Sequence, residues 1–133
     1  PSICPDLTKA FREVQDYYQK VPEVHLVSFT IDPKYDSSKV LKAFGDKYGA
    51  NHARWHFLNG SYDSLARLMG EGYLLMQPKM NDEPAKVEHT EVLVLIDKDG
   101  HIRGNYNGTS KEDVDRLIDE IRVLQLSYDP TRR

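Results

Sequence analysis

The sequence has few of the features that mark several large classes of protein. Its single cysteine, Cys4, cannot form an internal disulfide, so the cysteine count alone assigns no redox compartment. No apolar run reaches the ~18 residues that a membrane-spanning helix needs, and no signal-peptide pattern is recognisable. Basic residues are not concentrated, since 18 Lys and Arg stand against 21 Asp and Glu for a net charge of −3. We therefore expect no binding to nucleic acid and no adsorption to anionic membranes.

The composition that remains is that of one ordinary globular domain. At 133 residues the chain fits a single domain, because ~100 to 200 residues per domain is usual. Its 39% hydrophobic and 29% charged residues are typical of folded proteins. We expect one domain over residues 1–133, with a frayed tail over 127–133. The chain starts without methionine and reads as a processed or truncated piece.

The stretch around Cys4 is the first candidate for chemistry. Pro5 suits the first position of a helix, and an apolar stripe at helical spacing follows it. The stripe consists of Leu7, Phe11, Val14 and Tyr18. A helix over about 6–19 then places Cys4 at or near the N-cap, where backbone N–H groups and the helix dipole favour thiolate, which is a nucleophile and a soft metal ligand. The alternative is that Cys4 is only a small buried hydrophobic residue; the Cys-Pro-helix context favours a function.

The rest of the chain alternates helices and buried strands. The patterns predict strand 24–32, a helix from Ser37 or Ser38 to Gly49, strand 55–58, helix 62–69, a long loop over 76–86, strand 92–96, strand 101–105 and a last helix capped by Ser110. The Asp-Lys-Asp-Gly turn at 97–100 makes the last two strands antiparallel. We therefore predict an α/β or α+β fold with a mixed sheet covered on both faces.

Asp32 and several histidines and methionines are further candidates. Asp32 follows a strand at its carboxyl end, where open α/β sheets bind ligands, although an aspartate there also commonly caps a loop or helix. His52 and His56 are four residues apart, a ligand spacing only on a helix, so we interpret them as structural or exposed. Met76 and Met80 offer thioethers in the long loop, where gap-filling or exposure is the simpler interpretation.

Four segments in the same order resemble the Sco/SenC family of thioredoxin-fold copper-binding proteins. They are SICP at 2–5, VSFTIDPKYD at 27–36, WHFLNG at 55–60 and EHTEVLVLIDKDGHIRGNY at 88–106. The resemblance spans nearly the whole chain. It implies a thioredoxin-like α/β fold, with a mixed central sheet flanked by helices, from which the N-terminal strand before the cysteine motif is missing in this chain.

The resemblance also implies a metal site. Cys4 matches the second cysteine of the family's Cys-x-x-x-Cys-Pro motif, and the first would lie immediately before Pro1, outside this sequence. His89 matches the family's histidine ligand, and Asp32 matches an acidic residue near the site. The implied metal is copper, because thiolate favours Cu(I) and imidazole helps to hold Cu(II). Cys4 and His89 are thus the expected metal ligands.

The function that the resemblance implies is that of a copper metallochaperone, which is not an enzyme. It would deliver copper to the binuclear copper centre of cytochrome c oxidase. A rival is a thiol-disulfide oxidoreductase, with Cys4 as its catalytic thiol, that reduces the oxidase subunit's cysteines. A third possibility is a peroxidase of the peroxiredoxin or glutathione peroxidase type. His89 discriminates between the first two, because reduction does not require a histidine ligand.

Partners and location follow from the same resemblance. The expected partners are the copper-bearing subunit of cytochrome c oxidase, other copper chaperones and thioredoxin-like reductants. The expected location is extracytoplasmic and membrane-anchored, in a bacterial periplasm or on the mitochondrial inner membrane facing the intermembrane space. Any anchor or signal would lie upstream of Pro1, and the domain itself is expected to be a monomer.

Overall fold

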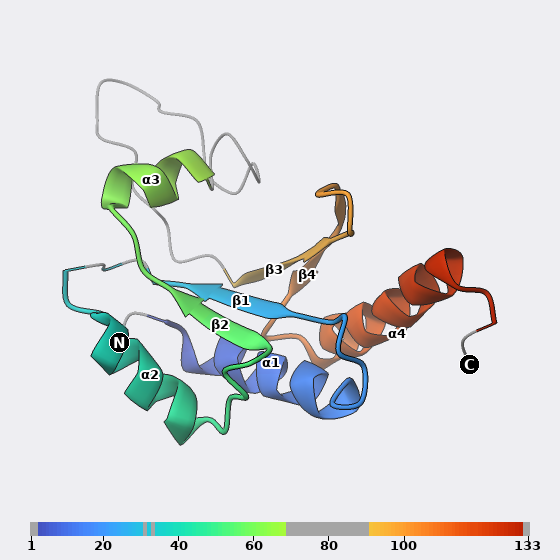
Figure 1. Ribbon diagram of the computed structural model, residues 1–133, viewed down its shortest axis with the longest axis horizontal. Helices are drawn as coiled ribbons and strands as arrows, with labels where there is room; N and C mark the ends of the chain where they lie inside the picture. Colours follow the sequence, from blue (N-terminus) through green and yellow to red (C-terminus); the bar gives the residue numbers. More distant parts are fainter. Residues whose placement is uncertain (1–2, 31, 33, 69–90, 132–133) are drawn as a thin grey trace.

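The structure is a computed structural model that describes residues 3–30, 32, 34–68 and 91–131 (Figure 1). Four helices and four strands lie in these residues. In chain order they are α1 (Pro5–Tyr17), β1 (Leu26–Phe29), α2 (Ser38–Lys47), β2 (Trp55–Leu58), α3 (Tyr62–Arg67), β3 (Val92–Ile96), β4 (Ile102–Asn107) and α4 (Lys111–Tyr128). The predicted order of elements is therefore confirmed. The expected loop over 76–86, with Met76 and Met80, lies outside the described residues, and so does His89.

Helix ends follow the capping residues of the sequence. The Ser37 hydroxyl accepts a hydrogen bond from the backbone N–H of Val40 at 3.3 Å, which starts α2. The Ser110 hydroxyl accepts one from Asp113 at the same distance and starts α4. Gly49 ends the second helical segment with a φ of +73°, a left-handed conformation that glycine adopts without strain.

The last helix is longer than the sequence patterns predicted. The α4 helix continues through Tyr128, into the stretch expected to be frayed from residue 127 onward. The Tyr128 hydroxyl accepts a hydrogen bond from the backbone N–H of Lys98 at 3.2 Å. The Lys98 ammonium also lies 4.6 Å from the centre of the Tyr128 ring. These contacts with the β3–β4 turn hold the end of the helix in place.

The strands pair in both senses, which confirms the mixed α/β class. The β1 strand runs parallel to β2, with Leu26 opposite Trp55 and Phe29 opposite Leu58. The β3 strand runs antiparallel to β4. Within the described residues the two pairs form separate two-stranded sheets, so β1 and β3 each have one edge without a neighbouring strand.

The buried face of β1 is not the more apolar one. Leu26 and Thr30 are buried, whereas Val27 on the alternate face is 40% exposed. The reason is Trp55, which is fully buried and whose indole N–H donates to the Ser28 hydroxyl at 3.0 Å. A buried indole needs such a partner, so the face that carries Ser28 turns inward. Among the described residues, the β1–β2 pair packs mainly on the face that carries Leu26 and Trp55, which lie against Ala10 and Val14 of α1.

Two hydrophobic clusters hold the described elements together. The larger one joins both sheets to α1 and α4, and its buried members are Ala10, Val14, Tyr18, Leu26, Trp55, Leu93, Tyr106, Val114, Leu117 and Ile121. The smaller one consists of Ile3, Leu41 and Phe44 and joins the start of the chain to α2. None of the helices in the described part of the chain has the length and hydropathy to cross a bilayer.

Candidate functional site

Cys4 is the N-cap residue of α1, as the sequence predicts. Its backbone is extended, with φ −63° and ψ 125°, and Pro5 occupies the first helical position. Its carbonyl accepts hydrogen bonds from the backbone N–H of Thr8 at 3.1 Å and from the Thr8 hydroxyl at 2.8 Å. The thiol itself makes no capping hydrogen bond to the helix, is not in a disulfide and is half-buried. The backbone of Cys4 is thus fixed while its sulfur stays available for chemistry.

The residues on both sides of Cys4 are anchored in the protein interior. Ile3 is buried in the small cluster with Leu41 and Phe44 of α2. Leu7, one turn into α1, packs against the large cluster. Cys4 therefore lies between Ile3, which packs in the smaller cluster, and Leu7, which packs against the larger one. These two contacts fix the position of Cys4 relative to both α1 and α2.

The start of β3 and the end of β4 lie close to the first turns of α1, near Cys4. Figure 1 shows the start of α1, the carboxyl end of β1 and the start of β3 at the same end of the molecule. The backbone N–H of Gly108, at the end of β4, donates to the carbonyl of Glu91 at 2.8 Å. A Cβ atom on Gly108 would lie 2.2 Å from Cδ2 of Leu7, so this glycine also touches the first turns of α1. Glu91 is two residues after His89, which lies outside the described residues, so the pairing of Cys4 with His89 stays a prediction.

Asp32 lies in a turn just after β1 and is exposed. Its carboxylate accepts a hydrogen bond from the backbone N–H of Tyr35 at 3.3 Å, and its carbonyl accepts one from Asp36 at 2.9 Å. Its own N–H donates to the Thr30 hydroxyl at 3.0 Å. This is the loop-capping arrangement that the sequence left open as an alternative, and a place near a metal stays a prediction.

Asp36 is a buried acidic residue at this end of the sheet that the sequence reading did not single out. It is fully buried, and its carboxylate accepts a hydrogen bond from the Thr30 hydroxyl at 2.6 Å. The side-chain amide of Asn59 donates to the Asp36 carbonyl, also at 2.6 Å. Asp36 therefore ties the end of β1 to the residue after β2. It lies in the VSFTIDPKYD segment, but nothing in that pattern distinguishes a buried aspartate from an exposed one.

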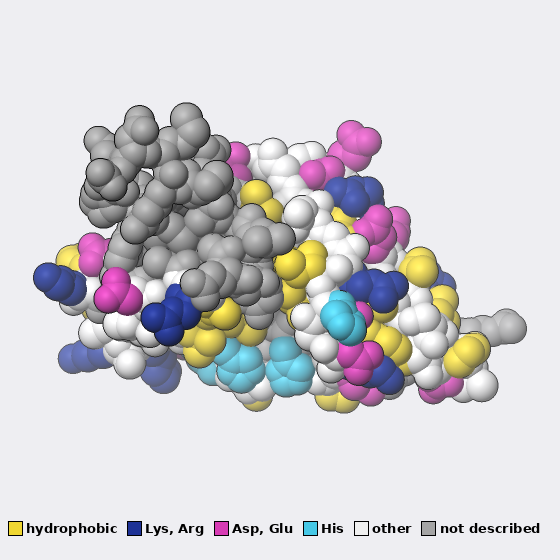
Figure 2. Space-filling view, turned by 90° about the horizontal axis from the view of Figure 1, so that it is seen from above, with side chains coloured by type: hydrophobic (Ala, Val, Ile, Leu, Met, Phe, Trp, Pro, Cys, Tyr) yellow, Lys and Arg dark blue, Asp and Glu magenta, His cyan; other side chains and the backbone are white. Residues whose placement is uncertain are grey.

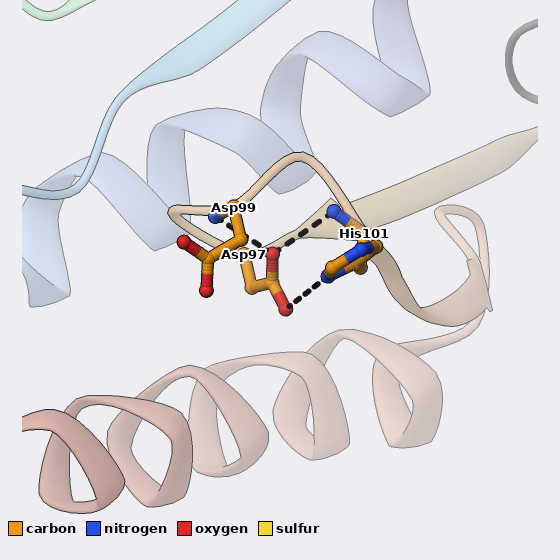
Figure 3. Close-up of side chains that lie close together, drawn as sticks. All are labelled: Asp97, Asp99 and His101. Atoms are coloured by element: carbon orange, nitrogen blue, oxygen red, sulfur yellow. Dashed lines mark hydrogen bonds and ion pairs between the residues drawn. The ribbon is translucent and has the colours of Figure 1, made fainter.

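A second group of potential ligands lies in the β3–β4 turn. Among the described residues, Asp97, Asp99 and His101 are the one group of three such side chains with donor atoms within 4.8 Å of one another. Figure 3 shows the Asp97 carboxylate turned toward the backbone of the turn and the His101 ring. One of its oxygens accepts hydrogen bonds from the N–H groups of Asp99 and His101, both at 2.9 Å. Its other oxygen lies 3.5 Å from the Arg103 guanidinium.

These contacts explain the Asp97 group as a structural turn. The backbone N–H of His101, and after it that of Asp99, hold the pKa of Asp97 below its usual 3.8, and the charges of His101 and Arg103 act in the same direction. The Asp97 side chain is only 5% exposed, and a guanidinium already neutralises it. The group does what an aspartate at the start of a tight turn ordinarily does.

The two histidines at four-residue spacing do not act together. His52 contacts the Asp46 carboxylate at 2.8 Å, and this hydrogen bond, followed by that of Lys42, lowers the pKa of Asp46. The prediction of a structural or exposed role is confirmed for His52. His56 instead meets His25, a residue that the sequence reading did not consider, with ring nitrogens 3.4 Å apart.

Comparison with known protein families bears directly on the Cys4 region. The family model described as SCO1/SenC matches residues 1–125, which include Cys4, Asp32 and His89. The chain belongs to the SCO1/SenC family. The recognition made from the four sequence segments is therefore confirmed.

Relatives of this SCO1/SenC chain include proteins of known structure. The "SCO1 protein homolog" of Bacillus subtilis (strain 168) is 27% identical over 123 residues, which are 91% of this chain and 63% of that protein. The crystal structure of a SCO1/SenC family lipoprotein from Bacillus anthracis str. Ames superimposes with a TM-score of 0.76 at 26% identity, covering 92% of this chain and 73% of the other. BsSco, described as a member of the Sco family of cytochrome c oxidase assembly proteins with a disulfide switch, gives 0.73 at 26% identity, covering 90% and 70%. The likeness to these structures agrees with the thioredoxin-like fold.

Proposed function

We propose that this SCO1/SenC protein carries copper and delivers it to the binuclear copper centre of cytochrome c oxidase. In this proposal Cys4 and His89 bind the metal, and Asp32 lies near it. The observation that carries the proposal is the state of Cys4, whose sulfur is free, half-buried and placed at the start of α1, while its backbone is held by Thr8. The family assignment and the description of BsSco as an oxidase assembly protein support the choice of cargo and target.

The chemistry of the proposed donors suits copper as a cargo. A thiolate is a soft ligand that selects Cu(I), whereas a neutral imidazole also holds Cu(II). A carrier must release its metal to the recipient's ligands, so its site has to be reachable from outside. Cys4 is compatible with this need, because its thiol is only half-buried and makes no capping hydrogen bond to α1.

A redox role is the second candidate, and the disulfide switch described for BsSco favours it. In that role the Cys4 thiolate attacks a disulfide of the oxidase subunit and forms a mixed disulfide, which a second thiol then resolves. Two electrons pass from the two thiols to the partner's disulfide. Cys4 is the single cysteine of these 133 residues, so the second thiol has to be supplied from elsewhere. A thioredoxin-fold peroxidase is a weaker third candidate, which rapid peroxide consumption by the reduced protein would favour.

Partners and location belong to the same proposal. We place the protein outside the cytoplasm on a membrane anchor, and one relative of similar structure is a lipoprotein. Its proposed partners are the copper-bearing oxidase subunit, other copper chaperones and thioredoxin-like reductants. The carrier is proposed to act as a monomer.

The deciding experiment is a titration of the natural protein, as its host makes it, with Cu(I) and with Cu(II). We expect one tightly bound copper, and the Cu(II) form should show the charge-transfer absorption of a thiolate ligand. Cys4→Ser should abolish that absorption and the tight binding, because it removes the soft ligand. His89→Ala should weaken binding by more than ~10-fold, since the loss of even an outer-sphere partner costs at least that much.

The matched control is His101→Ala, which removes an exposed histidine from the β3–β4 turn and should leave copper binding unchanged. Copper that binds equally well to the Cys4→Ser protein would contradict the proposed site. Weak copper binding combined with rapid disulfide exchange at Cys4 would assign the protein to the thiol oxidoreductases. An oxidase that assembles normally with the His89→Ala protein would point the same way.

A further inference from the structure

His25 and His56 form a pair on the outer side of the β1–β2 sheet, and nothing in the proposed function uses them. Nδ1 of His25 lies 3.4 Å from Nε2 of His56, and the two rings are tilted by only 15°. His25 is exposed and His56 is half-buried. Figure 2 shows two histidine side chains next to each other on the surface seen in that view, beside hydrophobic side chains.

The two imidazole rings meet edge to edge. Their centres are 5.7 Å apart, whereas the facing nitrogens are 3.4 Å apart. Rings stacked face to face would have centres about as close as their nearest atoms. The nitrogens of His25 and His56 therefore face a common gap, and 3.4 Å is longer than the ~2.9 Å of a good hydrogen bond, so the direct contact between them is weak.

We propose that His25 and His56 form a surface site for a tetrahedral divalent metal ion, for which zinc is the best match. Imidazole nitrogens bind Zn²⁺ at about 2.0–2.1 Å, so two of them on one tetrahedral ion lie about 3.3 Å apart. The observed 3.4 Å already matches this separation. Each ring has to turn so that its lone pair points at a common ion instead of at the other ring, and neither side chain is fully buried.

The backbone holds the two histidines in register. Val27 is opposite His56 in the parallel pair, which places His25 and His56 as diagonal neighbours. The N–H of Leu26, next to His25, donates to the carbonyl of Arg54 at 2.9 Å. This bond fixes the start of β1 against the start of β2, where His56 lies. The Arg54 guanidinium also donates to the carbonyl groups of Tyr18, Gln19, Val21 and Val24. These bonds join the segment before His25 to the start of β2, so the separation of the two rings does not depend on a mobile loop.

The site supplies two ligands, and water completes the coordination. In the described part of the chain, no third histidine, cysteine or carboxylate joins His25 and His56 within ligand distance of both. An exposed site with two protein ligands binds its ion more weakly than a closed structural site and exchanges it readily. This site is separate from Cys4 and contains no sulfur, so the zinc proposal does not depend on the proposed copper function.

The test is a Zn²⁺ titration by calorimetry of the natural protein carrying Cys4→Ser, which removes the thiol as a competing ligand. We expect one bound Zn²⁺ whose affinity falls by more than ~10-fold in both the His25→Ala and the His56→Ala versions of that protein. In NMR spectra of the Cys4→Ser protein, the ring protons of His25 and His56 should shift on zinc addition. His101→Ala is the matched control and should bind as the parent does.

His25→Ala is the safer of the two variants, because His25 is exposed and precedes β1. If His56→Ala disturbs the strand, His25→Ala alone decides the question. Zinc binding that is unchanged by His25→Ala would overturn the proposal. A parent protein that binds no zinc, or ring signals of the pair that stay in place while zinc binds, would overturn it as well.

Discussion

At the scale of single residues, Gly108 determines how closely β4 approaches the cysteine helix. A Cβ atom at this position would lie 2.2 Å from Leu7 Cδ2 and 3.2 Å from Leu93 Cγ. In Gly108→Ala the Leu7 side chain has to move, although it packs against the large core. We expect the free energy of unfolding to fall by about 1–3 kcal/mol, the usual cost of an overfilled core, as measured by urea denaturation.

Gly60→Ala is the control for that substitution, because a Cβ atom there meets no atom within 4 Å. It should change the free energy of unfolding by less than ~0.5 kcal/mol. Equal stability of the Gly108→Ala protein and the parent would show that Leu7 has room to rotate away. The proximity of β4 to the start of α1 would then not depend on this glycine.

The sequence could predict the structural position of some residues but not of others. Cys4 was predictable because its neighbours carry the local signals of a helix start. The His25–His56 pair was not, because it joins residues 31 apart in the chain through the register of two strands. Asp36 is similar, since its burial depends on Thr30 and on tertiary packing at the end of β1. Contacts within one turn of chain can be predicted from sequence, and contacts that require a register cannot.

At the scale of elements, two buried tyrosines hold α4 against the rest of the fold. The Tyr18 hydroxyl, just after α1, donates to the carbonyl of Ile118, and the Tyr106 hydroxyl on β4 donates to Glu120. Burial raises the pKa of Tyr18 from 10.0 to about 12, with the charges of neighbouring groups adding to it. Burial and the hydrogen bond to Glu120 likewise raise the pKa of Tyr106 to about 12. The folded protein thus resists ionisation of both groups.

We expect stability to decline in alkali because of these tyrosines. Their folded-state pKa values are above those of the unfolded chain, so their contribution is complete below pH 10 and is lost as the pH rises from 10 to about 12. Urea unfolding at several pH values should show this decline, and Tyr18→Phe and Tyr106→Phe should each make it shallower. Each should also cost about 0.5–1.5 kcal/mol near neutral pH through the lost hydrogen bond.

Tyr35→Phe provides the comparison, since Tyr35 is 67% exposed. It should leave both the neutral stability and the alkaline slope as they are in the parent. An alkaline slope that does not change in either buried-tyrosine variant would mean that other groups, or the net charge of the protein, control unfolding at high pH.

The positions of helices and strands were easier to predict from sequence than which face of each element is buried. The caps at Ser37 and Ser110 and the stop at Gly49 are local signals, and the helices begin and end close to them. The inward face of β1 depended instead on the hydrogen bond that Ser28 accepts from the buried Trp55 indole. The sequence pattern predicted a strand here but did not say which of its faces is buried, because that depends on contacts with β2.

At the scale of the whole molecule, the strands of the described residues fall into two separate pairs, β1 with β2 and β3 with β4. The parallel pair and the antiparallel pair share no ladder within the described residues, and the large core joins them through side chains only. The sequence predicted the antiparallel pair from the local turn at 97–100 and a mixed sheet from the alternation of helices and strands, but it did not predict which strand pairs with β1. How the two pairs meet depends on tertiary packing, which no local pattern specifies.

The edge of β1 that has no neighbouring strand among the described residues can be tested by amide hydrogen exchange. The N–H groups of Leu26 and Thr30 donate to carbonyl groups on the β2 side, at 2.9 and 3.2 Å. In a parallel pair alternate residues face opposite edges, so the N–H groups of Val27 and Phe29 face the edge without a strand. After correction for intrinsic rates, these two should exchange on the order of 100-fold faster than those of Leu26 and Thr30.

Protection of the Val27 N–H that rises with protein concentration would show that this edge pairs between molecules. Equal protection at every dilution would mean that another segment covers the edge in solution, contrary to the two separate sheets.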